Sequence, residues 1–463
     1  MSRPNLLYIM TDQQRWDSMG CSGGWAKTPN LDRIAAEGVQ FSNCVTASPI
    51  CVSARVSLAT GRYPHTTGVW DNAVYTLPPD SPTWMRAVRD LGYRTSLFGK
   101  THLHPLSIKG VDLREQEHLL HAWGLDDVDE ISGPRASAWG MSHMTARWEA
   151  LGLLDAYRIE HEERFAEKPY MVRPSSLPLE EYADVYVGRM ATEYLTAYDR
   201  PEPWSCWVSF GGPHEPWDTP EPWASLHRPE DMPEPAPKLP HDPSRPASSL
   251  DRWAGILTPD FEPGEERRLR ADYAGNVSLI DDQIGRLLAA IEARGELDNT
   301  VIVFSSDHGE MNGDHGMIYK MNFFDGAVRV PLLVRTPESV GSALAGTVND
   351  SPAECIDIGP TLVEAAGGVV EHEQFGQSLL SSLDGSRHRE DAISEFQREI
   401  MLMTDDWKLV VNESGEPYLL FDRNADPDET NNLATEPGAE DIRRELKGRM
   451  LERLVQSQVV IPW

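Results

Sequence analysis

Short apolar runs alternate with amphipathic helical patterns along most of this sequence. Residues 5–10 (NLLYIM), 204–210 (WSCWVSF) and 300–307 (TVIVFSSD) each have the length and composition of a buried strand. A periodic segment from about residue 265 to residue 294 precedes the last run, in the position of a crossover helix. Such alternation is typical of a parallel sheet with helices on both faces. The sequence therefore predicts an α/β fold with a large, mostly parallel sheet.

Two predicted helices have clear start and end signals. Residues 28–38 (TPNLDRIAAEG) begin with Thr28 as N-cap, place a proline at the first helical position and end at a glycine. Residues 81–92 (SPTWMRAVRDLG) repeat this pattern with Ser81 as the expected cap. A strand-like segment, 93–99 (YRTSLFG), follows directly. We therefore expect helix and strand to alternate here as well.

Two segments depart from the alternation. Residues 201–246 are dense in proline, which predicts an irregular surface excursion. After about Phe375, short apolar runs separated by turn residues suit an antiparallel meander, and a helical pattern over 440–458 follows. We expect a catalytic α/β domain over residues 1–375 and a smaller α+β subdomain, with an antiparallel sheet and a helix, over 376–463.

The charge of the chain excludes several classes of partner. Acidic residues outnumber basic residues by 73 to 42, and the formal net charge of −31 disfavours binding to nucleic acid or to an anionic membrane surface. The first apolar run is too short for a secretory signal, and no run is long enough to span a bilayer. We therefore expect a cytoplasmic protein without nucleic-acid or membrane partners, in which an anionic ligand must find a local positive pocket.

One of the five cysteines stands in an unusual position. The number of cysteines is odd and no CxxC spacing occurs, so neither a disulfide framework nor a zinc site is indicated. Cys51 lies at the expected start of a helix in residues 49–61 (PICVSARVSLATG), with Arg55 one turn further on. A free cysteine is usually a small buried hydrophobe, whereas a cysteine at a helix N-terminus beside an arginine has a lowered pKa and can be a nucleophile. Both interpretations remain open on these residues alone.

Polar and ionisable side chains follow four of the predicted strands. They are Asp12 and Gln13 after the first strand, Lys100 and His102 after residues 93–99, His214 after residues 204–210, and Asp307 and His308 after the strand that begins at residue 300. The carboxyl ends of parallel strands form the edge at which open α/β sheets bind ligands. We therefore expect these residues to converge on one site.

The residues of this edge include candidate metal ligands. Asp12, Asp307 and His308 offer carboxylate and imidazole ligands for a divalent cation, and Gln13 adds an amide oxygen. An Asp-His pair after a strand is also a common helix cap, but its convergence with Asp12 favours one metal ion. Oxygen-rich ligation favours Ca²⁺, while the single imidazole leaves Mn²⁺ or Mg²⁺ open.

Three further side chains supply positive charge. Lys100, Lys320 and Arg55, taken singly, are more often solvated surface charges. If two carboxylates neutralise a divalent cation, however, these three cations remain to bind a tetrahedral oxyanion. The sequence thus predicts an anion site beside a metal site.

Four segments together resemble the type I sulfatases of the alkaline phosphatase superfamily. They are residues 51–69 (CVSARVSLATGRYPHTTGV), 99–102 (GKTH), 211–217 (GGPHEPW) and 305–320 (SSDHGEMNGDHGMIYK). The resemblance covers nearly the whole chain and implies an alkaline phosphatase-like fold with a C-terminal subdomain. In that family a maturation enzyme oxidises the motif cysteine to formylglycine, whose hydrated aldehyde is the nucleophile.

The resemblance also implies a role for each site residue. Cys51 matches the residue converted to formylglycine, and Arg55 matches the arginine that holds it. The remaining matches are Asp12, Gln13, Asp307 and His308 for the metal ligands, Lys100, His102, His214 and Lys320 for the residues around the sulfate, and Asn72 for an active-site asparagine. One hydroxyl of the hydrate attacks sulfur while His214 or Lys320 protonates the leaving alcohol, and His102 takes a proton from the second hydroxyl.

The subfamily is less sharply defined than the family. Residues 68–74 (GVWDNAV) and 99–105 (GKTHLHP) look most like choline sulfatases, whereas residues 227–233 (HRPEDMP) look like phosphonate monoester hydrolases. Ser53 stands where proline is more usual in the motif, which leaves open which maturation system modifies the cysteine.

Three functions follow as alternatives. The leading hypothesis is a sulfatase for a small sulfate ester, because Lys100 and His102 replace the hydroxyl side chains that the resembled phosphonate hydrolases carry there. The second is a phosphonate monoester or phosphodiester hydrolase on the same scaffold. The third is a silent anion-binding protein whose Cys51 remains a thiol.

Two loops and the last residues of the chain carry no recognisable motif. We expect them to determine which substrate binds and whether the chain forms oligomers. Loops at residues 118–148 and after His214 are placed to select the alcohol half of the substrate. The apolar residues 459–463 must be buried against their own chain or against a second copy, so a homo-oligomer remains an alternative.

Overall fold

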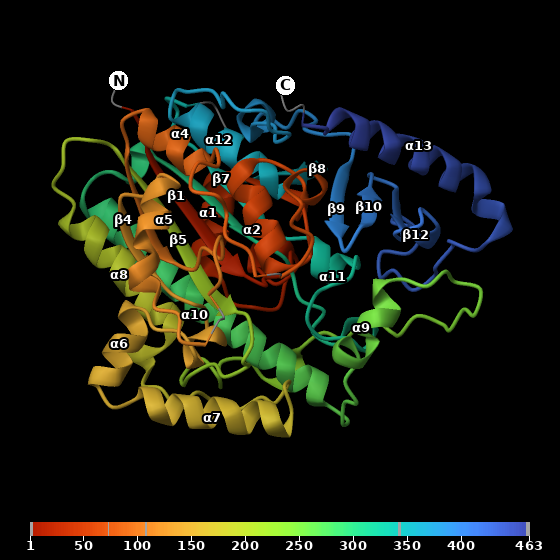
Figure 1. Cartoon of the computed structure of the whole chain (residues 1–463), viewed down its shortest axis with the longest axis horizontal. Helices are drawn as coiled ribbons and strands as arrows, with labels where there is room; N and C mark the ends of the chain where they lie inside the picture. The colour runs from red at the N-terminus through yellow and green to blue at the C-terminus, as the bar shows by residue number, and fades with distance from the viewer. Residues whose placement is uncertain (1–2, 73, 107–108, 341–343, 460–463) are drawn as a thin grey trace.

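A large mixed sheet forms the centre of the protein (Figure 1). The computed structural model describes residues 3–72, 74–106, 109–340 and 344–459. Within these residues eight strands form this sheet, in the order β4 (Asp127–Glu130), β3 (Arg94–Gly99), β5 (Trp204–Pro213), β1 (Asn5–Asp12), β6 (Thr300–Ser306), β7 (Leu332–Arg335), β2 (Val39–Val45) and β8 (Thr347–Glu354). Only β7 among them runs antiparallel to its neighbours. The predicted mostly parallel α/β sheet is confirmed.

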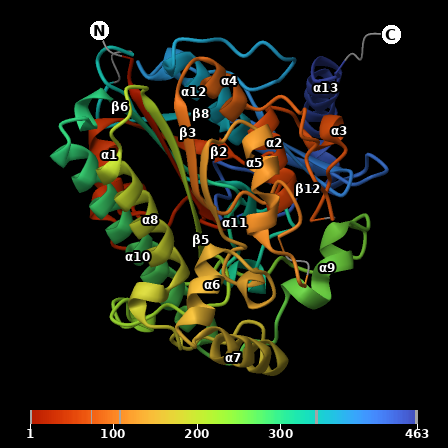
Figure 2. The ribbon, with the colours of Figure 1, turned by 60° about the vertical axis from the view of Figure 1, so that its left-hand side comes forward.

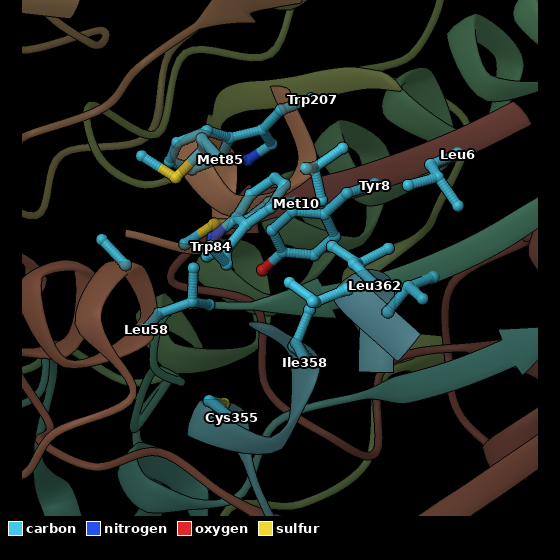
Figure 3. Close-up of a cluster of buried hydrophobic side chains, with 14 of the residues drawn as sticks. Leu6, Tyr8, Met10, Leu58, Trp84, Met85, Trp207, Cys355, Ile358 and Leu362 are labelled. Atoms are coloured by element: carbon cyan, nitrogen blue, oxygen red, sulfur yellow. The ribbon is translucent and has the colours of Figure 1, made fainter. Parts of the chain in front are cut away.

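The central strand β1 is buried on both faces because its neighbours are covered by helices. Its residues Leu6, Tyr8 and Met10 point into one core, while Leu7 and Ile9 point into the other. Figure 3 shows the first core, in which the Tyr8 ring stacks on Trp207 with centroids 5.9 Å apart and meets Trp84 edge-on. A strand of continuous apolar residues is what burial on both faces requires.

Helices lie on both faces of the large sheet (Figure 2). The core that contains Tyr8 includes residues of α2 (Cys51–Thr60), α4 (Trp84–Asp90) and α12 (Ile358–Ala365). The opposite core includes residues of α1 (Pro29–Glu37), α8 (Ala183–Ala197) and α10 (Glu265–Ala293). Helix α10 is the predicted crossover helix, and it leads directly toward β6.

The predicted helix caps are only partly right. Helix α1 begins after Thr28 as expected, but the Thr28 hydroxyl donates to Asp32 at 3.0 Å instead of accepting from the helix. The Ser81 cap is wrong: α4 begins at Trp84, and the Thr83 hydroxyl accepts from the backbone N–H of Arg86 at 3.2 Å. This later start lets Trp84 enter the core, which outweighs the weak preference of a capping residue.

The region expected to be a variable loop at residues 118–148 contains regular structure. Helices α5 (Glu117–Ala122) and α6 (His143–Ala150) flank strand β4, which adds an edge to the sheet. The apolar pattern missed β4 because three of its four residues are acidic, as a partly solvated edge strand allows. The proline-rich excursion is irregular as predicted only after β5 ends, with one short 3₁₀ turn at Pro229–Asp231 before α9 (Ser249–Leu257).

The C-terminal part forms the predicted antiparallel meander and helix. Its sheet has the order β12 (Pro417–Asp422), β11 (Trp407–Val411), β10 (Glu399–Met403) and β9 (Ala392–Phe396). Helix α13 (Glu440–Gln456) packs on one face through Leu446 and Met450. Residues of the other face, Met403 and Tyr418 among them, share a core with the segment that follows β6, so this sheet supports the edge of the large one.

Two expectations concern the chain as a whole. None of the helices in the described part of the chain is both long and apolar enough to cross a membrane. Four of the five residues in the apolar segment 459–463 lie outside the described residues.

Candidate active site

The ends of four strands bring together the residues that the sequence singled out. Asp12 is the last residue of β1, and Gln13 follows it in a left-handed backbone conformation with φ of 70°. Lys100 follows β3, His214 follows β5 and Asp307 follows β6. Because β3, β5, β1 and β6 are consecutive parallel neighbours, their carboxyl ends lie along one edge.

A buried cluster lies at this edge. Asp12, Cys51, Asp307 and His308 each direct one atom of metal-binding type into a space where these atoms are within 4.8 Å of one another. The Nδ1 atom of His308 bonds to the backbone oxygen of Gly309 at 3.0 Å, so Nε2 faces the cluster and lies 3.0 Å from the Cys51 sulfur. Two carboxylates and an imidazole are a donor set that fits a hard or borderline divalent cation.

Gln13 contacts this cluster through its backbone, and its side chain is held by neighbouring charged residues. Its backbone N–H donates to Asp307 Oδ1 at 3.0 Å. Its side-chain oxygen accepts from Lys320, and its side-chain nitrogen donates to Glu215 at 3.2 Å and to Glu310. The amide is therefore held on both sides.

Arg55 is fully buried beneath the cluster and has a different role from the one expected. Its Nε donates to Asp307 at 2.7 Å, and one terminal nitrogen donates to Asp12 at 3.0 Å. The other donates to the backbone oxygen of Lys100 at 2.6 Å. The expectation of three free cations for an oxyanion is wrong for Arg55, because all its nitrogens are engaged and, among the described residues, it is not one that lines the cavity. Arg55 instead holds the two carboxylates in place.

A cavity of about 740 Å³ opens above the cluster. Six of the predicted site residues line it: Cys51, Asn72, Lys100, His102, His214 and Lys320. The outer wall is mainly aromatic and apolar, with Trp139, Tyr170, Trp253 and Tyr319, and carries one cation, Arg135. Within the described residues, Lys100 and Lys320 are the lysines of the lining. Lys100 also pairs with Asp12 at 2.6 Å, so part of its charge is already offset there.

Helix α2 presents Cys51 as its first residue. The side-chain oxygen of Asn72 accepts from the backbone N–H of Val52 at 2.9 Å and so stabilises the start of this helix. Ser53 is buried, and its hydroxyl donates to the backbone oxygen of Val69 at 2.6 Å. These two contacts join residues 69–72 to the first turn of α2.

The environment of Cys51 differs from that of the other buried cysteines. Burial raises the pKa of the Cys206 thiol to about 12, against a small opposing effect of Ser96. Burial also raises the pKa of Cys51, but the charges of Lys320 and Lys100 outweigh it and hold that pKa well below its usual value. A cationic field around a cavity-lining cysteine indicates a chemical role, so the interpretation as a small buried hydrophobe is disfavoured.

Two histidines line the cavity in different surroundings. Burial and the charge of Lys100 lower the pKa of His102, so its ring is neutral at neutral pH. Its Nδ1 atom is buried and has no hydrogen-bond partner within the described parts of the chain. His214 lies with Nε2 at 2.9 Å from the Lys320 ammonium group and with Nδ1 at 3.1 Å from Glu215.

Three charged residues of the site were not predicted from the sequence. Glu215 directly follows His214, Glu310 lies two residues after His308, and Arg135 belongs to the region expected to be a variable loop. The sequence did contain a signal for Glu215 and Glu310, because each lies one or two residues after a histidine predicted to belong to the site. Arg135 gave no such signal, because it approaches the site only through the fold.

The fold and this site define the class of protein. A large, mostly parallel sheet with a carboxylate and imidazole cluster beneath a cationic cavity is the arrangement of the alkaline phosphatase superfamily. A family model described as "Sulfatase" matches residues 4–369, and one described as "N-sulphoglucosamine sulphohydrolase, C-terminal" matches residues 313–456. The chain belongs to the sulfatase family, whose members are hydrolases of sulfuric ester bonds.

Two curated relatives are sulfatases, and a solved phosphonate monoester hydrolase shares the scaffold. A choline-sulfatase of Rhizobium meliloti (strain 1021) is 30% identical over 94% of this chain and 83% of its own length. An arylsulfatase of Clostridium perfringens (strain 13 / Type A) is 29% identical over 93% of this chain and 90% of its own. The solved phosphonate monoester hydrolase of Agrobacterium radiobacter is 26% identical, with a TM-score of 0.76 over 98% of this chain and 96% of that one.

Proposed function

We propose that this chain hydrolyses small sulfate monoesters through a formylglycine formed from Cys51 and one bound divalent cation. The observation that carries the proposal is the position of Cys51. Its sulfur lies 3.0 Å from His308, and the residue lines the cavity together with Lys100 and Lys320. A nucleophile at this point would meet the sulfur atom of a sulfate group bound between the two lysines.

The cation site consists of Asp12, Gln13, Asp307 and His308. Asp12, Asp307 and His308 belong to the buried cluster, and the resemblance adds the amide oxygen of Gln13. Three oxygen donors and one imidazole favour Ca²⁺ and leave Mn²⁺ or Mg²⁺ as alternatives. When bound, the cation supplies Lewis acidity, which makes the nucleophile more acidic and offsets negative charge on the sulfate oxygens. Arg55 contacts both Asp12 and Asp307 and holds the two carboxylates in position for it.

Formylglycine gives residue 51 a hydroxyl nucleophile whose second hydroxyl allows sulfate to be released afterwards. Conversion of the cysteine replaces the Cβ–S bond by Cβ=O: water supplies the oxygen, sulfur leaves as H₂S, and two electrons and two protons pass to a two-electron acceptor such as dioxygen. Only 2% of Cys51 is exposed, so the maturation enzyme must act before this part of the chain has folded. The third alternative, a silent anion-binding protein, would leave this lowered-pKa thiol unconverted.

Lys320, His214 and His102 have different roles in proton transfer. Burial lowers the pKa of Lys320, but the negative charges of Cys51 and Glu215 outweigh it and raise that pKa. Conversion of Cys51 removes the first of these charges, while Glu215 and Asp12 remain to stabilise the protonated Lys320. We assign protonation of the leaving alcohol to Lys320, with His214 orienting its ammonium group at 2.9 Å. His102, neutral because of burial and the charge of Lys100, is the base that takes a proton from residue 51.

The outer wall favours a small organic alcohol. Trp139, Tyr170 and Trp253 offer aromatic faces that suit an apolar, planar or quaternary ammonium group. A net charge of −31 repels a highly sulfated polymer at long range. The choline-sulfatase relative makes choline sulfate one substrate to include in any test.

Three substrates with the same leaving group separate the proposed function from its main alternative. An aryl sulfate, the matching aryl phosphonate monoester and the matching phosphodiester each carry one negative charge, so local geometry decides between them. We expect the highest kcat/KM for the sulfate, because His102 and Lys100 are placed to release a sulfate group from residue 51. Steady-state kinetics on one enzyme batch measures this. A higher kcat/KM for the phosphonate would transfer the assignment to the phosphonate hydrolases.

A further inference from the structure

We propose that Glu310 is a positioning residue that, with Glu215, fixes the orientation of the Gln13 side-chain amide. The inference rests on the proposed cation site, to which Gln13 contributes its oxygen. The amide nitrogen cannot bind a cation, so a site that uses Gln13 must hold the amide in one of its two orientations. The two glutamates lie on the nitrogen side of this amide.

The hydrogen bonds of the amide allow only one orientation. Its nitrogen carries two hydrogens and donates one to Glu215 Oε2 at 3.2 Å and the other to Glu310 Oε2. Its oxygen accepts from Lys320. A rotated amide would bring its oxygen against two carboxylate oxygens and its nitrogen against an ammonium group, which leaves donors facing donors and acceptors facing acceptors.

The two carboxylates are themselves fixed. Glu310 is fully buried, and its Oε1 accepts from the backbone N–H groups of Asn312 at 3.1 Å and Tyr319 at 2.5 Å. Glu215 is 2% exposed, and its Oε1 accepts from Arg135 at 3.2 Å. The glutamates follow β6 and β5 respectively and Gln13 follows β1, so three separate strand ends meet at this amide.

A glutamine at position 310 could not replace the glutamate. Both carboxylate oxygens of Glu310 act as acceptors, one for two backbone N–H groups and one for Gln13. In Glu310→Gln, the single oxygen would stay with the two backbone donors, and the new NH₂ group would face the nitrogen of Gln13. The Gln13 amide would then rotate and turn its nitrogen toward the cation site.

Glu215→Gln is a matched control, because it removes the same charge from the same amide. Its oxygen can stay at the Oε2 position, where Gln13 donates and where His214 Nδ1 lies 3.1 Å away, and its NH₂ group then faces Arg135. The Arg135 side chain is 45% exposed and can turn to water. The orientation of Gln13 is therefore retained in this variant.

Calorimetric titration of the metal-free full-length chain with Ca²⁺ tests the proposal. We expect Ca²⁺ affinity to fall roughly 10–100-fold in Glu310→Gln, the range for loss of a group that orients a metal ligand, and to change less than about threefold in Glu215→Gln. Thermal unfolding without metal should be similar for wild type and both variants. A merely structural Glu310 would lower that thermal stability and leave the affinity of the folded fraction unchanged.

The outcomes separate this inference from the proposed function. Wild-type binding of one Ca²⁺ with equal affinity in Glu310→Gln would overturn the inference and leave the cation site standing. A wild-type chain that binds no Ca²⁺, Mn²⁺ or Mg²⁺ would overturn both. If Glu310→Gln does not fold, Glu310→Asp takes its place with the same expectation, because its shorter side chain cannot reach Gln13 and the backbone donors together.

Discussion

Asp307→Ala is expected to remove the bound cation and to lower kcat/KM by more than roughly 10³-fold, since charge stabilisation and nucleophile placement are lost together. Asp307 accepts from the backbone N–H groups of Gln13 and His308 and from Arg55. The substitution therefore removes a proposed ligand and frees the residues beside it. Elemental analysis and turnover of an aryl sulfate, measured on the same preparation, provide the test.

The control for this variant must account for lost stability. Breaking a buried ion pair costs about 3–5 kcal/mol, so thermal unfolding of Asp307→Ala must be measured as well. Asp357→Ala is a matched control: Asp357 is fully buried against Arg389 and, among the residues that the structure describes, is not part of the cavity lining. We expect Asp357→Ala to lose stability but keep its metal. An Asp307→Ala protein that retains both metal and turnover would show that the ligand assignment is wrong.

His102→Ala is expected to lower kcat by roughly 10²–10⁴-fold, the range for loss of a general base. The first half of the reaction does not need this base, so one equivalent of alcohol should be released rapidly before the slow phase. Stopped-flow detection of a chromogenic alcohol would show this burst. His104→Ala is the control, since His104 pairs with Glu130 at 2.7 Å and, within the described residues, does not line the cavity. Slow turnover without a burst, or unchanged turnover, would contradict the role of His102.

The role of His102 as a base also determines how kcat should change with pH. A base works in its deprotonated form, and burial together with Lys100 lowers the pKa of His102. The neutral form therefore persists below the ordinary histidine value of 6.5, and the acidic limb of kcat in the wild type should lie below that pH. Conversion of Cys51 strengthens the effect, because the contacts of the Cys51 sulfur with His102 raise this pKa. The acidic limb of the pH profile of kcat should be absent in His102→Ala.

The sequence was sufficient to predict the central strands. Strands β1, β5 and β6 are buried on both faces, so their apolar runs are continuous and leave a clear signal. Edge strand β4 has the sequence DVDE and no such signal, because solvent can reach part of it. The start of α4 was also missed, since the burial of Trp84 decided it and not the local capping preference of Ser81.

For the site, the positions of residues along the chain predict which side chains lie close together. They do not predict which of these side chains form ion pairs. Asp12, Lys100, His214 and Asp307 follow neighbouring parallel strands, so the order of strands and helices along the chain is enough to predict their convergence. The distribution of charge could not be predicted in this way, because pairing depends on side-chain geometry. Arg55 pairs with Asp12 and Asp307 instead of facing the cavity, and that pairing is visible only in three dimensions.

Mass spectrometry of the peptide that contains Cys51 shows whether residue 51 is a formylglycine. The measurement must be made on the same sample whose sulfatase activity is determined, because a host without the maturation enzyme yields thiol and low activity. We expect the thiol to be replaced by an aldehyde or its hydrate, and the activity to rise in proportion to the converted fraction across preparations. A fully active sample that contains only the unmodified Cys51 thiol would contradict it.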